Sequence, residues 1–331
     1  MPEPDCPPGH AKLRVAHNGI CGTDLHEYYA GPIFFPTEPH PLTGASLPLI
    51  MGHEFSGTVV EAGEGVRAVA PGDRVAVEPI YRCGSCAPCQ EGHYNVCRQI
   101  GFHGLMSNGG MAEYTVVPEY MLHRLPDEVS PELGAMVEPM AVAYHAARLG
   151  GVGPGDHAVV FGAGPIGIGL WFALRGEGVE DITVVEPSAA RREAIERLGA
   201  ADVIDPRAVD PARHIMRRTK DRGAAAAYDA AGVEASVESA LSCVGAHRPL
   251  VSVAVYERPL TTSLLKLVLS ESRIQGSLCY TADDYRRVID LMARGHYDTT
   301  GWVGHIPLDQ LHDEGFAALH AGTKMKVLVD L

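Results

Sequence analysis

The glycine-rich segment at residues 159–167, Val-Val-Phe-Gly-Ala-Gly-Pro-Ile-Gly, constrains the fold more than any other feature of the chain. It follows an apolar run at 157–161 and opens a helical pattern at 165–175, the context in which a strand turns directly into a helix. Apolar runs and helical stretches then keep alternating, with a strand expected at 182–186 and a helix at 189–198. This alternation predicts an α/β fold in which a doubly wound parallel sheet carries helices on both faces.

The glycines of this segment suit a dinucleotide site. Gly162 permits the tight turn after the strand, Gly164 lets the backbone approach a pyrophosphate, and Gly167 allows helix and strand to pack closely. The helix N-terminus, which includes Ile166, would then face the phosphates. A G-x-G-x-x-G pattern alone can be a mere tight turn, but its place between a strand and a helix favours dinucleotide binding.

The end of the next predicted strand indicates which dinucleotide is bound. Glu186 follows the loop by about twenty positions, where a carboxylate accepts hydrogen bonds from the ribose hydroxyls and repels a 2′-phosphate. The sequence therefore predicts NAD in preference to NADP. Arg191 is assigned to the same site, although Arg191 and Arg192 are also consistent with a solvated helix face.

The length and charge of the chain narrow the class of protein. A chain of 331 residues suits two domains. Its net charge of −14 argues against nucleic acid as a partner, because phosphate binding needs a concentrated basic surface. No apolar run approaches the roughly 20 residues needed to span a bilayer, and residues 1–10 do not resemble a secretory signal. We therefore expect no membrane partner and a cytoplasmic location.

The amino-acid composition and the secondary-structure pattern of the chain change near residue 150. The earlier part is rich in Gly, Pro and His and has short β-like runs at 55–61 and 74–79. A helix is expected at 282–294, and the strand expected at 324–330 has no obvious partner in the α/β part, so we expect it to return to the first domain. The predicted first domain is 1–140 completed by 278–331, and the predicted second domain is 141–277.

Four of the eight cysteines form one tight cluster, Cys83, Cys86, Cys89 and Cys97. Thiolates spaced by two residues can turn back onto one ion, and four of them complete a tetrahedral zinc site with bonds of roughly 2.3 Å. A closed all-sulfur site has no position for a substrate, so this zinc would be structural. The alternatives are unconnected thiols, two disulfides or an iron–sulfur cluster, and the spacing favours zinc.

A second set of possible metal ligands is dispersed along the chain. It consists of Cys21, His53, Glu54 and Glu138. One Cys, one His and one carboxylate leave a fourth position open, as catalytic zinc requires. Each residue taken alone is better explained as an ordinary core or surface residue, so the prediction depends on the combination.

The motifs in this order resemble the zinc-containing medium-chain dehydrogenases, and the resemblance covers essentially the whole chain. It starts from Gly-Ile-Cys-Gly-Thr-Asp at 19–24 and Gly-His-Glu at 52–54, and continues through the cysteine cluster and the glycine loop. Within that superfamily the chain is similar to the 2,3-butanediol dehydrogenases. The segments that carry this narrower similarity are 26–36, 40–44, 77–83, 92–97 and 102–104.

The resemblance implies a GroES-like, β-rich catalytic domain with a structural zinc lobe at about 80–100, a Rossmann domain, and an active site in the cleft between them. It implies that Cys21 and His53 bind the catalytic zinc with either Glu54 or Glu138. Thr23 would lie beside the metal-bound oxygen, and His26 further along the path to solvent. Members of the family usually carry residues ahead of the segment like 2–5, so we expect an exposed sheet edge here.

The implied reaction is NAD-dependent oxidation of a small vicinal diol, 2,3-butanediol to acetoin and the reverse, by hydride transfer from a zinc alkoxide. The implied assembly is a homodimer or a homotetramer. Two alternatives stay open: a sorbitol or threonine dehydrogenase with the same metal and nucleotide sites, and a nucleotide-binding protein without catalysis.

Overall fold

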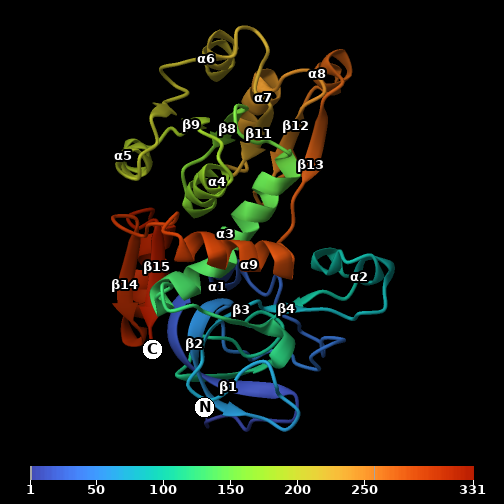
Figure 1. The fold of residues 1–331 in the computed structure, drawn as a ribbon, viewed down its shortest axis with the longest axis vertical. Coiled ribbons are helices and arrows are strands. Elements are labelled where there is room, and N and C mark those ends of the chain that lie inside the picture. Colours follow the sequence, from blue (N-terminus) through green and yellow to red (C-terminus); the bar gives the residue numbers. More distant parts are fainter. Residues whose placement is uncertain (1, 257) are drawn as a thin grey trace. The chain divides into compact units, whose positions relative to one another are not determined.

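The computed structural model describes residues 2–256 and 258–331, and the chain divides into two compact units (Figure 1). The first unit is Met1–Glu138, Thr281–Gly295 and Gly301–Leu331, and the second is Pro139–Tyr280 and His296–Thr300. Helix α3 (Pro131–Gly150) runs from the first unit into the second, with Pro139 inside it. The segment His296–Thr300, which the predicted limits give to the first domain, belongs to the second unit.

A seven-stranded mixed sheet is the frame of the first unit. Its strand order is β14-β15-β1-β2-β3-β7, and β6 also pairs with β1. Strands β14 and β15 are parallel to each other, and the other pairs are antiparallel. The strands are β1 (His10–Gly19), β2 (Glu54–Ala62), β3 (Arg74–Val77), β6 (Tyr114–Pro118), β7 (Leu122–Arg124), β14 (Val303–Pro307) and β15 (Lys326–Asp330).

Buried apolar residues on neighbouring strands hold this sheet together. Leu13 on β1, Phe55 on β2, and Val75 and Val77 on β3 are fully buried in one cluster, so removing their surface from water stabilises the pairing. The tail strand expected at 324–330 is confirmed as β15, which pairs antiparallel with β1.

Smaller elements complete the first unit. Two residues separate the end of β1 from the start of helix α1, and the short antiparallel pair β4–β5 brackets the loop that carries α2. The predicted helix at 282–294 is confirmed as α9. These elements are α1 (Gly22–Ala30), β4 (Ile80–Tyr81), α2 (Ala87–Gln90), η1 (Tyr94–Val96), β5 (Gly101–Phe102), η2 (Glu119–Met121), α9 (Ala282–Ala293), η3 (Leu308–Gln310), η4 (Leu311–Ala317) and α10 (Ala318–His320).

The second unit is built on a six-stranded parallel sheet, as the alternation of strands and helices predicts. The order is β10-β9-β8-β11-β12-β13, in which the chain moves outward from β8 first to one side and then to the other (Figure 1). This is the doubly wound order of the dinucleotide-binding fold. The strands are β8 (His157–Phe161), β9 (Asp181–Val185), β10 (Asp202–Ile204), β11 (Ala226–Asp229), β12 (Pro249–Ser252) and β13 (Arg273–Gly276).

The helices of this unit connect the parallel strands. They are α4 (Pro165–Gly176), α5 (Ala189–Arg197), α6 (Pro211–Arg218), α7 (Glu234–Cys243) and α8 (Leu264–Ser270). All five residues of β8 are buried, as expected for a central strand covered on both faces. Within residues 2–256 and 258–331, no helix combines the length and apolar character needed to cross a membrane.

Candidate metal centres and dinucleotide site

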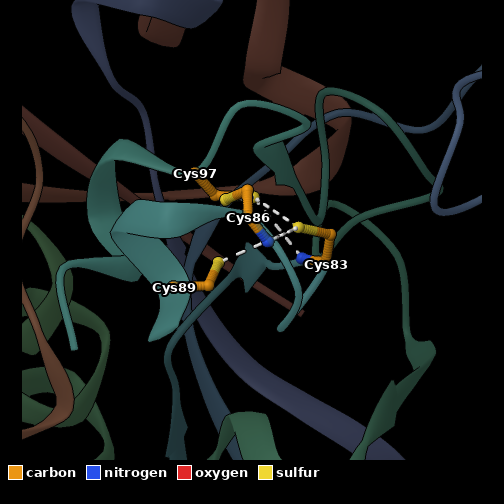
Figure 2. A group of neighbouring side chains, drawn as sticks. All are labelled: Cys83, Cys86, Cys89 and Cys97. Carbon is orange, nitrogen blue, oxygen red and sulfur yellow. Dashed lines mark hydrogen bonds between the residues drawn. The ribbon is translucent and has the colours of Figure 1, made fainter. Parts of the chain in front are cut away.

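The four clustered cysteines meet at one point in the loop around α2. Figure 2 shows their sulfur atoms facing one another, and all four lie within 4.8 Å of each other. Cys97 Sγ is 3.5 Å from Cys83 Sγ and 3.9 Å from Cys86 Sγ, and Cys83 Sγ is 4.0 Å from Cys89 Sγ. Sulfurs at the corners of a zinc tetrahedron would be about 3.8 Å apart, whereas a disulfide holds them at about 2.05 Å. The spacing fits a zinc ion and excludes two disulfides.

The surroundings of these sulfurs favour the thiolate form of Cys83 and Cys86 but not of Cys89. The backbone N–H groups of Cys83 and Gln99 each donate to Cys97 Sγ at 3.4 Å, and that of Cys86 donates to Cys83 Sγ at 3.4 Å. Backbone hydrogen bonds from Ser85 and Cys86 lower the pKa of Cys83 to about 6, whereas desolvation raises the pKa of Cys89 to about 12. Cys89 therefore keeps its proton near neutral pH when no cation is bound, and a divalent ion would supply the positive charge that its thiolate needs.

A second group of metal-ligand types forms where β1 meets α1 and where β2 begins. Cys21, His53 and Glu54 offer one ligand atom each, and these atoms lie within 4.8 Å of one another. His53 and Glu54 are buried, and Cys21 is half-buried. Cys21 caps the N-terminus of α1, while His53 and Glu54 lead into β2, which pairs with β1 as far as Gly19 opposite Glu54. Strand pairing thus brings together residues that are 32 positions apart or more.

Asp24 contacts both Cys21 and His53 of this group. Its Oδ2 accepts a hydrogen bond from the Cys21 backbone N–H at 2.9 Å, and its Oδ1 lies 3.5 Å from His53 Nδ1. A histidine that ligates a metal through one ring nitrogen commonly faces a carboxylate with the other. Burial lowers the pKa of His53, but the negative charges of Asp24 and Cys21 outweigh it and raise that pKa well above 6.5. The same field would favour a metal cation.

Lys326 is the residue of this region that the sequence did not reveal. It lies on β15 and is almost fully buried, and its ammonium group pairs with Glu54 and donates to the Ile20 carbonyl at 2.9 Å. Burial lowers the pKa of Lys326, but Glu54, Cys21 and Glu138 together raise it above 10.5. The predicted strand at 324–330 also contains Lys324 and Asp330, so no local signal singled out Lys326.

The other predicted site residues lie around this group. Thr23 Oγ1 is 3.6 Å from Cys21 Sγ, and His26 is half-buried one turn further along α1. Glu138 is buried on α3, and its charge acts on Lys326, but it lies outside the compact group of Cys21, His53 and Glu54.

The glycine loop of the second unit has the geometry of a phosphate-binding turn. Gly162 has a φ of +97°, a conformation that favours glycine. A Cβ at Gly167 would lie 1.9 Å from the Gly162 carbonyl oxygen, so this position accepts no side chain. Among the described residues, a Cβ at Gly164 would meet only Arg191 Nη1, at 3.8 Å, which leaves the backbone open in front of α4. Helix α4 begins immediately after Gly164, at Pro165, so its first N–H groups, including that of Ile166, face this opening.

Glu186 lies beside the loop and is held in place by the backbone. Its Oε2 accepts from the Ala163 N–H at 2.8 Å and its Oε1 from the Ser188 N–H at 2.7 Å. Arg192, by contrast, donates to the carbonyls of Glu186 and Pro187 at 2.9 Å and 2.7 Å, so it buttresses the turn. The loop thus carries a fixed carboxylate on one side and the Arg191 guanidinium over Gly164.

Comparisons with known proteins agree with this arrangement. Residues 7–127 match the family described as alcohol dehydrogenase GroES-like domain, and residues 165–294 match the zinc-binding dehydrogenase family. The chain is 41% identical over 331 residues to the (R,R)-butanediol dehydrogenase of Bacillus subtilis (strain 168), which covers 99% of this chain and 94% of that protein. It is 35% identical over 325 residues to the (R,R)-butanediol dehydrogenase of Neisseria gonorrhoeae, covering 96% of this chain and 91% of that protein. The crystal structure of 2R,3R-butanediol dehydrogenase from Bacillus subtilis matches with a TM-score of 0.93 at 41% identity, covering 100% of this chain and 95% of that one.

A GroES-like unit followed by a doubly wound dinucleotide-binding unit is the architecture of a zinc-dependent dehydrogenase. The chain belongs to the zinc-dependent medium-chain dehydrogenases, which confirms the predicted family, the fold class and the assignment as an oxidoreductase.

Proposed function

We propose that this chain oxidises a small vicinal diol with NAD, with 2,3-butanediol converted to acetoin and the reverse reduction as the preferred pair. The observation that carries this proposal is the 41% identity to a butanediol dehydrogenase over 99% of the chain, together with the metal-ligand group around Cys21. A binding protein without catalysis would not need Cys21, His53 and Glu54 to converge within 4.8 Å.

The chain would hold two zinc ions. Cys83, Cys86, Cys89 and Cys97 would hold a structural ion, and Cys21, His53 and Glu54 would hold a catalytic one. Bound zinc at the second group would supply a Lewis acid that lowers the pKa of the substrate hydroxyl.

The side chains around the catalytic group have separate tasks in this proposal. Asp24 orients His53 through its Nδ1 side. Thr23, beside Cys21, accepts the hydroxyl proton, and His26 on the next turn of α1 passes it toward solvent. Gly162, Gly164, Ile166 and Gly167 would hold the pyrophosphate of NAD, whose nicotinamide would supply the hydride acceptor.

Glu54 is better supported than Glu138 as the carboxylate ligand. Glu54 is in the compact group with Cys21 and His53, and Glu138 is not. Glu138 would then act at a distance: its negative charge raises the pKa of Lys326 and so stabilises the ammonium group next to Glu54.

The preference for NAD rests on Glu186. The N–H groups of Ala163 and Ser188 hold its carboxylate in place. The carboxylate would accept hydrogen bonds from the ribose hydroxyls and would repel a 2′-phosphate. Arg191, over Gly164, would face the pyrophosphate.

A homodimer is the assembly that the second unit supports, with a tetramer as a further step. Strand β13 is the last strand in its sheet, and β12 is its partner among the described residues. Beside it, Leu264, Leu265, Val268 and Leu269 of α8 are 61–77% exposed. An open sheet edge can pair with the same strand of a second copy of the chain, and the apolar helix face next to it can be buried in the same interface. Leu269→Glu would shift the mass in solution to that of a monomer, and an unchanged mass would exclude this face as the interface.

The first experiment compares kcat/KM for NAD reduction with (R,R)-2,3-butanediol, sorbitol and L-threonine, each before and after treatment with a chelator. We expect the butanediol to be preferred and its turnover to require the metal. Preference for sorbitol or threonine would keep the chemistry and reject the substrate. Absence of turnover in folded protein that holds zinc and NAD would reject the enzymatic proposal.

A further inference from the structure

A third group of metal-ligand types lies in the first unit, on a surface that none of the proposed reaction steps uses. His17 on β1, His305 on β14 and Asp330 on β15 place one ligand atom each within 4.8 Å of one another. His17 Nδ1 and His305 Nδ1 are both 2.8 Å from the same oxygen, Asp330 Oδ1. The two imidazole rings stand edge to face, with their centroids 5.4 Å apart.

Three strands of one sheet build this group, so its geometry is fixed by backbone pairing. His17 lies directly opposite Asp330 in the antiparallel pair β1–β15. His305 is two residues before Pro307, which pairs with Asp330 in the parallel pair β14–β15. Residues two positions apart on a strand point to the same face, so both imidazoles approach the carboxylate from one side of the sheet.

The distances fit a metal ion after a small expansion. Ligand atoms about 2.0–2.1 Å from a tetrahedral zinc are separated by about 3.3 Å, so each nitrogen would need to move from the Asp330 oxygen by about 0.5 Å. The side chains of His17, His305 and Asp330 are 23%, 35% and 46% exposed, so an ion can reach them and water can fill the remaining position.

Glu132 provides an independent feature of a metal site. Its Oε1 lies 3.6 Å from His305 Nε2, on the side of the ring opposite the Nδ1 that faces Asp330. Histidine ligands of metals characteristically direct their second nitrogen to a carboxylate, which fixes the ring and raises its basicity. His305 thus has one carboxylate near each ring nitrogen, Asp330 at Nδ1 and Glu132 near Nε2, which is the arrangement common around metal-ligating histidines.

We propose that His17, His305 and Asp330 form a third metal site, which binds a divalent transition-metal ion such as Zn²⁺ and is oriented by Glu132. Two imidazoles and one carboxylate are ligands that zinc, copper and nickel accept and that calcium and magnesium do not favour. The ion would fasten the C-terminal strand β15 to β1 and β14. This site does not depend on the proposed function.

The test measures zinc content by mass spectrometry on untagged protein dialysed against one buffered concentration of free Zn²⁺. Wild type is compared with Asp330→Asn and His305→Gln. The difference between proteins, rather than the absolute count, reports the third site, because the other metal groups are common to all of them. His312→Gln is the matched control, since His312 Nδ1 lies 2.6 Å from Asp313 Oδ1 and the described part of the chain places the pair in no group of three metal-ligand side chains.

We expect wild type and His312→Gln to hold one more zinc per chain than Asp330→Asn and His305→Gln. Glu132→Gln should keep the site but weaken its zinc affinity by about 10–100-fold in a calorimetric titration. Added Zn²⁺ should raise the Tm of wild type more than that of Asp330→Asn, and this readout does not require activity. Equal zinc content in wild type and Asp330→Asn, both folded, would overturn the proposal and leave the group as a hydrogen-bonded His-Asp-His cluster.

Discussion

Replacing Gly164 by Ala should separate the stability of the dinucleotide-binding unit from its affinity for NAD. The added Cβ would have Arg191 Nη1 as its one neighbour among the described residues, at 3.8 Å, which is ordinary van der Waals contact. The backbone at Gly164 has φ −74° and ψ −175°, which any residue adopts. The remaining cost is that of alanine as a helix N-cap, so we expect a loss of at most about 1 kcal/mol. For a unit of this size that lowers Tm by at most about 4 °C.

The effect on NAD should be much larger, because the methyl group would occupy the space through which the pyrophosphate approaches the backbone. Losing one hydrogen bond to a charged phosphate costs about 1.5–3 kcal/mol, which corresponds to a 10- to 150-fold weaker Kd. Gly167→Ala should behave differently, since its Cβ would lie 1.9 Å from the Gly162 carbonyl oxygen. That overlap forces α4 to shift and should cost about 1–3 kcal/mol of stability in addition to NAD affinity.

The assay pairs a calorimetric titration with NAD and a thermal unfolding curve for each variant. Gly153→Ala is the control, because no heavy atom of residues 2–256 and 258–331 lies within 4 Å of its added Cβ and the residue is not in the positive-φ region. It should change neither quantity. Unaltered NAD affinity in Gly164→Ala would refute the assignment of this loop to the pyrophosphate.

Three further predictions test other parts of the site. Cys97→Ser should lower the zinc content by one ion per chain and lower Tm, as measured by mass spectrometry and calorimetry, and an unchanged zinc content would contradict the four-sulfur site. Glu186→Gln removes a charge worth about 1–4 kcal/mol of repulsion at contact distance, so the kcat/KM ratio of NADP to NAD should rise by about tenfold or more, and no rise would exclude Glu186 as the discriminating residue. Burial lowers the pKa of His103 to about 3, so the folded protein keeps this ring neutral while the unfolded chain takes up a proton below about pH 6.5. Stability should therefore be full above pH 6.5 and fall by up to about 1.4 kcal/mol per pH unit toward pH 3, and chemical unfolding of His103→Gln, compared with wild type, should lack this part of the slope.

The fold of the α/β unit was predictable from the sequence because its signals are local, whereas the GroES-like fold of the first unit was implied by the family resemblance. The glycine loop between β8 and α4 and the apolar runs of β8 and β9 each lie within a few residues, and they determine a parallel α/β unit without long-range information. The helix at 282–294 and the strand at 324–330 were found in the same way. The short segment 296–300, by contrast, belongs to the second unit because of contacts with residues distant in the sequence, which a local pattern does not predict.

The two metal groups differ in how far the sequence can predict them. Cys83 to Cys97 occupy 15 consecutive positions, so their spacing alone restricts the geometry. Cys21 and His53 are brought together by the β1–β2 pairing, which no spacing rule predicts, so their assignment came from the family resemblance. The sequence left the carboxylate open for the same reason, because it contains no information on the distances of Glu54 and Glu138 from Cys21 and His53.

Lys326 shows why charge balance is the part of such a site that is hardest to predict. The acidic groups that act on it, Glu54, Cys21 and Glu138, come from three distant parts of the chain. A buried ammonium is tolerated only when it is paired, and Lys326 meets this condition through Glu54 and the Ile20 carbonyl. Asp24 and Cys21 also raise the pKa of His53, so a protonated His53 shares the neutralisation with Lys326, and a divalent cation bound at this group would take the place of that proton. The lysine therefore makes sense as a partner of a metal site: it holds Glu54 in place while leaving enough negative charge to attract an ion.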